Sequence, residues 1–191
     1  MASDLARPAP LAIVDLSSLS RLGFKGRETI AAMRTRGVLL EPVPNRAFRQ
    51  PDGSLCLVLG AGDVFLLGAL IGDNAGLAAL ADGWSMDEET RCYPLPRRDS
   101  HSWLAICGDA VPQIFAKICA VDLRLHRFAD LDAAQTAVAG LTAIVLRADI
   151  GGRPAFHLLS DSGAAQYMLA CLVDAAKEFG GQLTDMPRLP T

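Results

Sequence analysis

The chain has 191 residues, of which 51% are hydrophobic and 20% are charged, and its mean hydropathy is +0.27. This length fits one large domain, or two small halves that share a core. The 18 basic residues do not outnumber the 21 acidic ones, so no basic excess exists to neutralise a phosphate backbone, and we expect no nucleic-acid partner. Such an apolar composition requires a large core or a surface that something else covers.

The five cysteines are widely scattered and include no CxxC pair, which excludes a zinc framework and a disulfide scaffold. Several lie in apolar runs, where a free cysteine behaves as a small buried hydrophobe. Residues 1–12 contain two prolines and no sustained apolar run, unlike a signal peptide. We therefore expect a protein of the reducing cytoplasm. The cysteines are Cys56, Cys92, Cys107, Cys119 and Cys171.

The N-terminal third begins with a Pro- and Ala-rich stretch, residues 1–10, which we expect to be a flexible tail. Residues 11–19 are typical of a first strand, and a second short strand ends at Gly26. A helix over residues 29–37 follows, and Gly37 is expected to end it.

The helix over 29–37 is predicted to turn Ile30 and Met33 inward. The next stretch, residues 38–43, is expected to be extended. Pro42 and Pro44 keep it away from the centre of a sheet, because proline cannot donate a ladder hydrogen bond.

Residues 55–72 are almost entirely apolar, with Asp63 as the only charge, and their length is borderline for a membrane span. However, Gly60-Ala61-Gly62 divides the run into residues 55–59 and 64–67, which are strand lengths on either side of a turn. The pattern therefore predicts a β-hairpin and no membrane segment.

Asn74 is predicted to cap a short helix that runs through Leu77 and Leu80 to Gly83. The polar, acidic residues 85–89 follow and are the best boundary between two halves. We therefore divide the chain into a first half, 11–84, and a second half, 85–183, within one compact domain, followed by a flexible tail at 184–191.

The second half begins with a predicted edge strand over residues 90–95, which contains Pro94. A buried strand from Asp99 to Cys107 leads to a tight turn at Gly108 and a helix that Asp109 is expected to cap. The helix has an apolar stripe with helical spacing, formed by Val111, Ile114, Phe115 and Ile118.

Three more strands are predicted at residues 135–141, 142–148 and 154–159, and the last two flank a hairpin turn at 149–153. A final helix is expected from Ser162 to Gly180, long enough to cover a sheet. Strands alternate with helices, but hairpins dominate. The sequence thus predicts an α+β fold of mainly antiparallel sheets with packed helices, built from two repeated strand-Gly-helix halves.

The stretch Asp99-Ser100-His101-Ser102 contains every residue type of a hydrolase triad. Neighbouring residues on a strand point to opposite faces, whereas a triad needs three side chains that converge. We therefore interpret the stretch as the entry of a strand. No GxSxG motif, which would mark a nucleophile elbow, occurs in the chain.

Gly60-Ala61-Gly62 lacks the third glycine of a dinucleotide fingerprint and is followed by no capped helix, so it is interpreted as a turn. His101, His126 and His157 have no partner at metal-ligand spacing.

Arg91, Arg97 and Arg98, with Tyr93 between them, allow an anion or an acidic partner as an alternative, but we favour a solvated edge. No pair of carboxylates stands out as a general acid and base. The residues themselves therefore indicate no catalytic, cofactor-binding or metal-binding position.

A resemblance to a known family emerges at Asp15-Leu-Ser-Ser-Leu-Ser-Arg-Leu-Gly-Phe-Lys-Gly26, where a DLS triplet precedes a strand that ends in Lys-Gly before a helix. It resembles the opening of the folate-binding domain of glycine-cleavage T-proteins. The second half is similar to the same family over Trp103–Ala110, Val121-Asp122-Leu123, Ala134–Gly140 and Phe156–Ser160. The γ subunits of heterotetrameric sarcosine oxidases are the most similar members, over roughly residues 11–181.

The resemblance implies a subunit of a flavin-dependent complex that oxidatively demethylates sarcosine to glycine. In that family the one-carbon unit passes to tetrahydrofolate or leaves as formaldehyde. The larger α and β subunits hold FAD, FMN, NAD and tetrahydrofolate, and the small δ subunit holds zinc. The γ subunit has no catalytic residues of its own. By this resemblance the partners are the α, β and δ subunits, and this chain binds no cofactor.

The sequence departs from active T-proteins where a glycine turn precedes a strand with a pair of aspartates. Here Pro51-Asp52-Gly53 is followed by Ser54-Leu55-Cys56, without a carboxylate. No catalytic or folate-binding residue is therefore carried over. The alternatives are a subunit of a related N-methyl amino acid dehydrogenase, for example one acting on N-methylglutamate, and a free-standing folate-binding module. A folate-dependent iron–sulfur assembly factor is disfavoured, because its Lys-Gly-Cys motif is missing.

Overall fold

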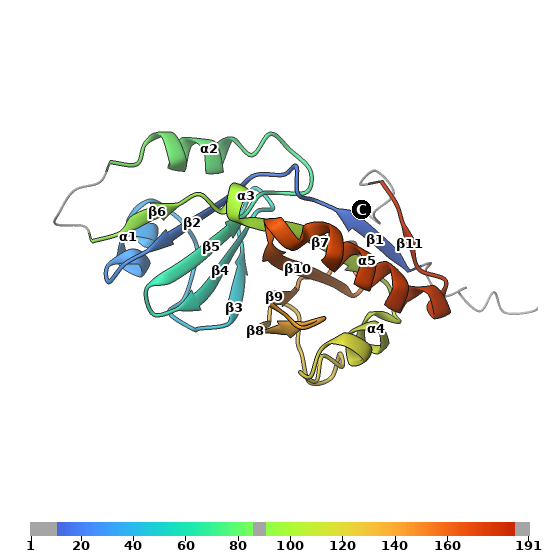
Figure 1. Ribbon diagram of the computed structural model, residues 1–191. Helices are drawn as coiled ribbons and strands as arrows, with labels where there is room; N and C mark the ends of the chain where they lie inside the picture. Colours follow the sequence, from blue (N-terminus) through green and yellow to red (C-terminus); the bar gives the residue numbers. More distant parts are fainter. Residues whose placement is uncertain (1–10, 86–90, 186–191) are drawn as a thin grey trace, which may run out of the picture.

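The computed structural model describes residues 11–85 and 91–185, which form two sheets with helices on their outer faces (Figure 1). Sheet A has the strand order β11-β1-β7-β10-β9-β8, and sheet B has the order β3-β4-β5-β2-β6. Neighbouring strands are antiparallel, apart from β1 and β11. The α+β class with mainly antiparallel sheets is therefore confirmed.

The strands of sheet A are β1 (Ala12–Asp15), β7 (His101–Cys107), β8 (Ala133–Val138), β9 (Leu141–Arg147), β10 (Ala155–Asp161) and β11 (Gln182–Leu183). Those of sheet B are β2 (Arg21–Lys25), β3 (Arg46–Arg49), β4 (Leu55–Gly60), β5 (Asp63–Leu67) and β6 (Tyr93–Leu95). The helices are α1 (Thr29–Thr35), α2 (Ala75–Asp82), α3 (Arg97–Ser100), α4 (Val111–Ile118) and α5 (Ala165–Ala176). Single 3₁₀ turns flank α5 at Ser162–Ala164 and Lys177–Phe179.

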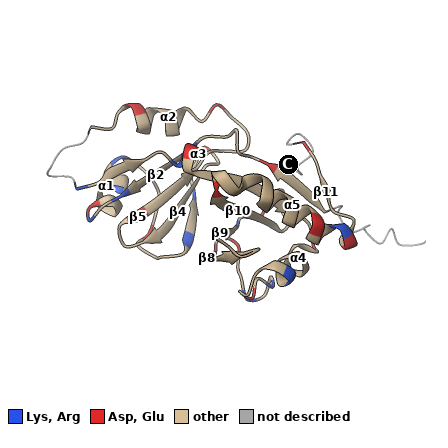
Figure 2. Ribbon diagram, viewed as in Figure 1, with Lys and Arg blue, Asp and Glu red and all other residues tan. Residues whose placement is uncertain are grey.

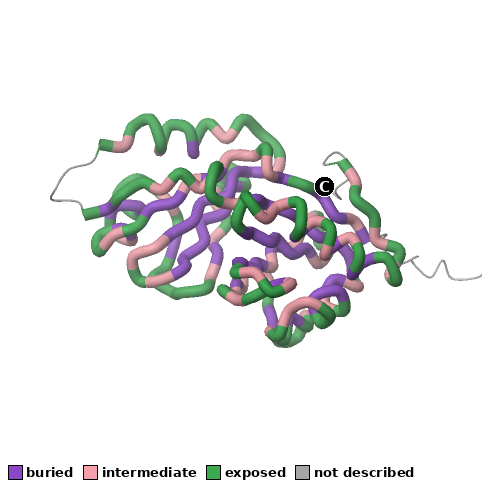
Figure 3. Tube along the Cα trace, viewed as in Figure 1, coloured by how far each residue is buried: buried purple, intermediate pink, exposed green. Residues whose placement is uncertain are grey.

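The two sheets share an apolar core between their facing sides, and the strands dominate the buried part of the molecule (Figure 3). Side chains alternate along β7, so Trp103 and Ala105 enter this inter-sheet core while Leu104 and Ile106 face the other way. Phe65 and Leu67 of β5 meet them from sheet B. Alternate residues of the central strands of both sheets thus form one common core.

Helices cover the outer face of each sheet. On sheet A, Phe115 of α4 and Met168 of α5 pack onto the outward residues of β7 and β10 and are fully buried. On sheet B, Met33 of α1 and Leu77 of α2 cover Leu66 and its neighbours. Most of the remaining surface of α2 is exposed. None of the described helices is long and apolar enough to cross a membrane.

The two predicted strand-Gly-helix units are present as a structural repeat. The segments β2-α1-β3-β4-β5 and β7-α4-β8-β9-β10 have the same element order, and their strands pair in equivalent orders within their sheets. Gly26 and Gly108 end β2 and β7 with φ values of +149° and +136°, which L side chains rarely adopt. A Cβ on Gly26 would also lie 2.0 Å from the carbonyl oxygen of Arg91. Both turns therefore require glycine.

Each half gives its leading strand to the other half's sheet. Strand β1 pairs with β7 in sheet A, although β1 precedes β2 in the chain. Strand β6 pairs with β2 in sheet B, although β6 precedes β7. The chain therefore crosses between the sheets twice, once through residues 16–20 and once through residues 96–100. Because of this exchange, neither sheet is complete without both halves.

Arg21 holds the two crossings together, and its side chain is buried, with 5% exposed. The guanidinium donates to the carbonyl oxygens of Leu16 at 3.3 Å and Leu19 at 2.9 Å in the first crossing. It also donates to the carbonyls of Ser17 at 3.1 Å and Arg98 at 3.0 Å, and Arg98 lies in the second crossing. One side chain thus satisfies four carbonyl groups from two distant segments.

The predicted hairpin at residues 55–67 is confirmed, with β4 and β5 joined through Gly60-Ala61-Gly62. The turn lies against the first strand-Gly-helix unit, where Gly26 N–H donates to the Gly62 carbonyl at 2.8 Å. The extended stretch 38–43 lies outside both sheets, as expected, and Gly37 follows α1 with φ +81°.

Asn74 and Asp109 do not form the predicted side-chain caps, although Asn74 is the N-cap residue of α2. The side chain of Asn74 turns back to the loop before α2, accepting from Ala69 N–H at 2.6 Å and donating to its carbonyl at 3.3 Å. Asp73 instead accepts from Ala75 N–H at 3.0 Å. The N-cap position of α4 is Ala110, one residue after Asp109, and no side-chain cap is formed there.

Other boundaries differ from the sequence-based expectations. Asp99 and Ser100 belong to the single turn of α3, so β7 starts at His101. Strand β8 ends at Val138, and the left-handed pair Ala139-Gly140 turns the chain into β9. Strand β11, which the sequence did not indicate, pairs with the edge strand β1. The expected tail at 1–10 and most of the link at 85–89 lie outside the described residues.

We predict that Arg21→Met lowers the free energy of unfolding by about 3–5 kcal/mol, because methionine leaves four carbonyl groups without their charged donor. Urea denaturation measures this loss. Arg27→Met is the matched control, since Arg27 is exposed and lies beyond the other end of β2, and it should change stability by about 0.5 kcal/mol or less. Equal effects of the two substitutions would contradict the role of Arg21.

Candidate functional site

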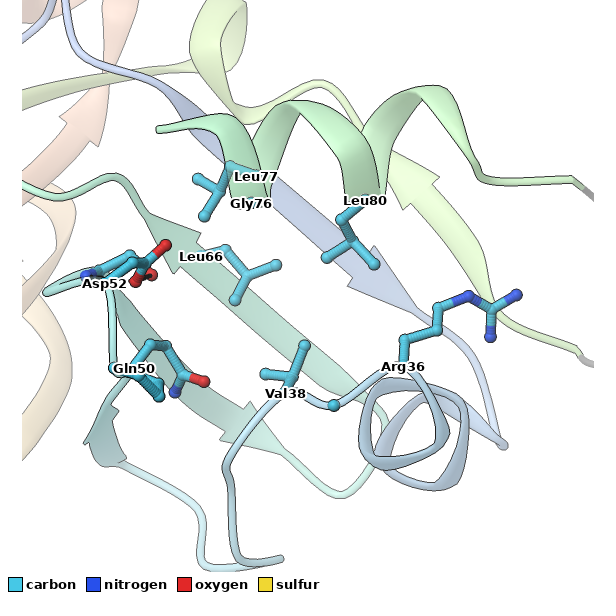
Figure 4. A pocket seen from close by; sticks show the side chains of 11 residues that line it. Arg36, Val38, Gln50, Asp52, Leu66, Gly76, Leu77 and Leu80 are labelled. Atoms are coloured by element: carbon cyan, nitrogen blue, oxygen red, sulfur yellow. Dashed lines mark hydrogen bonds between the residues drawn. The ribbon is translucent and has the colours of Figure 1, made fainter. Parts of the chain in front are cut away.

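A cavity of about 270 Å³ lies between α2 and the outer face of sheet B (Figure 4). Its walls are largely apolar, with Leu66 from β5, Leu77 and Leu80 from α2, and Val38 from the segment after α1. The loop 50–54 closes one end. The full lining is Arg36, Gly37, Val38, Gln50, Pro51, Asp52, Ser54, Leu66, Gly76, Leu77 and Leu80.

The cavity exists because α2 rests on sheet B through few large side chains. Its sequence, Ala-Gly-Leu-Ala-Ala-Leu-Ala-Asp, offers Leu77 as its only buried residue. Gly76, in the first turn, faces the loop, and a Cβ there would lie 3.1 Å from an Asp52 carboxylate oxygen. Small residues along α2 therefore leave space that a helix with larger side chains would fill.

Asp52 is the charged group at the closed end of the cavity. Its Oδ1 accepts from the backbone N–H of Ser54 at 2.9 Å and from the Ser54 hydroxyl at 2.6 Å. The hydroxyl bond is the main reason that the pKa of Asp52 is lowered, so the carboxyl stays ionised at neutral pH. Such a group can hold a cation or N–H donors, but it cannot act as a general acid.

The other polar side chains of the cavity already have partners. Gln50 bonds both backbone groups of Leu39 at 2.8 Å and also donates to the Phe48 carbonyl at 3.0 Å. The Arg36 guanidinium lies 4.0 Å from the centre of the Trp84 ring, and in Figure 4 it points away from the cavity. The cavity is thus an apolar space with one ionised carboxylate. It holds no second titratable group with which Asp52 forms an acid–base pair.

The stretch from Asp99 to Ser102 forms no triad among the described residues. His101 and Ser102 point to opposite sides of β7, as alternation requires, and Ser102 is buried with its hydroxyl 3.0 Å from that of Ser160. Ser100 lies before the strand, and its hydroxyl is 2.8 Å from His101 Nδ1. Ser100 also donates to the Pro96 carbonyl at 3.3 Å. His101 has no hydrogen bond to a carboxylate in the described structure, so no group orients it as a base.

The three histidines remain apart. His126 is exposed on a loop, and His101 is half-buried at the edge of the inter-sheet core. His157 is buried at the centre of that core, where Trp103 Nε1–H donates to its Nδ1 at 2.9 Å. The described residues contain no group of three or more His, Cys, Asp or Glu side chains that is suited to a metal ion.

The arginines near Tyr93 do not converge on an anion site. Arg97 folds inward over Gly23, where its Nη2 lies 3.1 Å from Asp63 Oδ1 and its guanidinium lies 5.0 Å from the Phe65 ring. Arg91 is exposed, as is Tyr93 at the sheet edge. Charged residues are spread over many elements of the fold rather than collected on one (Figure 2).

The positions of Asp52 and Arg21 were not predicted from the sequence. Asp52 was recognisable only as part of a Pro-Asp-Gly turn, because α2, which faces it, is more than twenty residues away. Arg21 resembled an ordinary charged residue at the start of a strand, and no local signal indicates that it is buried. Both depend on contacts between segments that are distant in the sequence.

Comparison with known proteins places the fold. No protein-family model matches the chain, and no curated protein matches it. A chain of the heterotetrameric sarcosine oxidase from Corynebacterium sp. U-96, solved in complex with pyrrole 2-carboxylate, is 19% identical with a TM-score of 0.73. This match covers 90% of this chain and 86% of that one.

The aminomethyltransferase T of the glycine cleavage system from Bartonella henselae is 14% identical with a TM-score of 0.64. This match covers 92% of the present chain but 48% of the aminomethyltransferase, so our chain spans about half of that protein. At these identities the likeness establishes the fold alone. The chain has the T-protein-like fold that its motifs indicated.

We predict that His157 makes the protein less stable as the pH falls from about 6.5 to about 4. Burial lowers the pKa of His157 to about 4, so below pH 6.5 the unfolded chain binds a proton that the folded chain does not. The loss is about 1.4 kcal/mol per pH unit and about 3 kcal/mol in all.

The measurement is the difference in unfolding free energy between wild type and His157→Asn at several pH values, so that shared carboxylate titrations cancel. The asparagine variant should be less stable at neutral pH but should lose less on acidification. His126→Asn is the control for an exposed histidine. Parallel pH curves for wild type and His157→Asn would show that His157 does not cause the loss.

Proposed function

We propose that this chain is a non-catalytic subunit, of the γ type, in a flavin-dependent complex that oxidatively demethylates sarcosine. The observation that carries the proposal is the fold match with a chain of a heterotetrameric sarcosine oxidase over nearly the full length of both chains. The match with the aminomethyltransferase, by contrast, covers 48% of that protein. The TM-score of 0.73, against 0.64 for the aminomethyltransferase, favours the oxidase subunit over the transferase.

The chemistry of the site supports a non-catalytic role. Asp52 stays ionised and lacks an acid–base partner in its cavity. Both ring nitrogens of the buried His157 already have hydrogen-bond partners, Trp103 and, at 3.3 Å, the carbonyl of Ala148. Ser100 and His101 lack the third group of a triad within the described structure. Catalysis of an oxidation would also need a redox cofactor, which in this proposal other subunits provide.

Exposed apolar side chains support contact with partner subunits. Leu39 and Val43 flank the extended segment after α1 and are 53% and 50% exposed, and Ile71 before α2 is 73% exposed. Burying apolar surface at an interface stabilises an assembly by about 25 cal/mol per Å². In this proposal such residues contact larger α and β subunits that bind FAD, FMN, NAD and tetrahydrofolate, and the δ subunit binds zinc. The complex acts in the cytoplasm on sarcosine or a related N-methyl amino acid such as N-methylglutamate.

We predict that the tagged chain, expressed at its native level in its own cells, copurifies with flavin-containing subunits. The eluate should show flavin absorbance that sarcosine or another N-methyl amino acid bleaches anaerobically. The chain produced alone should carry no flavin. Recovery of a monomer without any flavoprotein from native cells would overturn the proposal.

A free-standing folate-binding module is the second candidate, and the cavity beside Asp52 is the observation that favours it. Its volume of about 270 Å³ admits a bicyclic ring, and an ionised carboxylate pairs with neighbouring N–H donors of an aminopyrimidine. The main proposal predicts no micromolar binding of tetrahydrofolate to the isolated chain, as measured by calorimetry.

Micromolar binding that Asp52→Asn weakens tenfold or more, while Asp82→Asn does not, would favour this second candidate. Asp82 is the matched control because it ends α2 and does not line the cavity. Binding that both substitutions leave unchanged would place folate elsewhere on the chain.

A further inference from the structure

The five cysteines fall into two groups by exposure. Cys56, Cys92 and Cys107 are buried, and burial raises the pKa of each thiol, to about 12 for Cys56 and about 11 for Cys107. Thiols of this kind are inert, since the thiolate is the reactive species. Cys119 and Cys171 are partly exposed. Reagents from solvent therefore reach two of the five thiols most readily.

These two exposed thiols line one shallow depression between α4, α5 and the β8–β9 turn. Cys119 follows the last residue of α4 and pairs with Val138 at the end of β8. Cys171 lies on α5, one turn after Tyr167, and the neighbouring thiol raises the pKa of the Tyr167 phenol. The depression measures about 620 Å³ and is open enough for small reagents to enter.

The β8–β9 turn connects the surroundings of the two thiols. Ala139 N–H donates to the Ile118 carbonyl at 2.8 Å, beside Cys119. The carbonyl of the same Ala139 accepts from the Tyr167 hydroxyl at 3.0 Å, beside Cys171. Ile118, next to Cys119, and Tyr167, one helical turn before Cys171, thus contact the two backbone polar groups of a single residue, Ala139. Sequence separation hides this proximity, since 51 positions lie between the two cysteines.

We infer that Cys119 and Cys171 form an oxidation-sensitive thiol pair, which hydrogen peroxide converts into an intrachain disulfide between α4 and α5. In the first step, one thiolate attacks a peroxide oxygen, the O–O bond breaks, and a sulfenic acid and water result after protonation. In the second step, the other thiolate attacks the sulfenic sulfur, an S–S bond forms, and a second water leaves. Two thiols lose two electrons, and one peroxide gains them.

The positions of the two cysteines suit this closure. A disulfide requires Cα atoms within about 7 Å, so the pair needs local freedom to approach. Cys119 lies past the end of α4 in an extended conformation, with φ −137° and ψ 136°, and its backbone is held by the Phe115 carbonyl and by Val138, so this freedom must come from the side chains and from α5. The helices already contact each other through Lys117 Nζ, which donates to the Ala175 carbonyl at 3.2 Å. The new bond would therefore reinforce an existing contact.

This inference goes beyond the proposed function and does not depend on it, because peroxide itself is the probe. The disulfide would then connect the two helices that cover sheet A.

The experiment treats the purified full chain with increasing hydrogen peroxide, followed by alkylation and peptide mass spectrometry. We expect the loss of two of five free thiols per chain and a cross-linked peptide pair that contains Cys119 and Cys171. Dithiothreitol should restore both. The single variants Cys119→Ser and Cys171→Ser should form no cross-link and should instead trap a dimedone adduct on the remaining cysteine.

Cys107→Ser is the matched control. Because Cys107 is buried, this substitution should leave the cross-link between Cys119 and Cys171 intact. Each of these variants differs from wild type by one atom, and circular dichroism verifies that it folds. If a serine variant does not fold, the corresponding alanine variant is used. Oxidation of one cysteine alone, cross-links between different chains, or full retention of all five thiols would each overturn the inference.

Discussion

The fold depends on the bonds by which Arg21 holds two crossings of the chain between its sheets. The leading strand of each half completes the sheet of the other half, so the chain must pass from sheet to sheet twice. Backbone carbonyls at such crossings have no strand partner, and a buried carbonyl without a donor costs free energy. Arg21 supplies donors to four of them, in segments as far apart as Leu16 and Arg98. Arg21 thereby connects the segments that link the two repeated units.

The exchange of strands also explains why no cavity is found between the two sheets in the described structure. The facing sides of both sheets are filled by a common core around Trp103 and Phe65, so the junction of the halves is packed with side chains. The buried His157 is neutral and fully bonded there, and it serves the packing of Trp103. Open space occurs under the small residues of α2 and beside α4 and α5. Both spaces lie outside the inter-sheet core.

The sequence predicted the local features of the fold and missed those that depend on distant contacts. Hydrophobic periodicity and the glycines at 26 and 108 were enough for the repeated units and the hairpin, since these are set within about twenty residues. The strand exchange and β11 were not predictable, because period-2 alternation shows which face is buried but not which strand is the neighbour. Asn74 and Asp109 are residue types that often cap helices. The Asn74 side chain instead bonds the loop before α2, and α4 starts one residue too late for Asp109 to be its N-cap.

The candidate site was predictable to a smaller extent than the fold. The expectation of no triad at Asp99–Ser102 rested on alternation, which holds for His101 and Ser102, but α3 places Ser100 beside His101 all the same. The cavity beside Asp52 required knowledge of where α2 lies. The T-protein-like motifs were more informative than any single residue, since their order reflects the whole fold that the solved structures share.

The central claim is that this 20.2 kDa chain is a cofactor-free part of a larger flavoenzyme. Native mass spectrometry of the intact assembly, followed by dissociation in the gas phase, tests it most directly. The account predicts one copy of this chain released at its bare polypeptide mass, with the flavin masses remaining on the other subunits. A flavin or folate retained by the released chain would contradict the claim, as would an assembly that contains only copies of this chain.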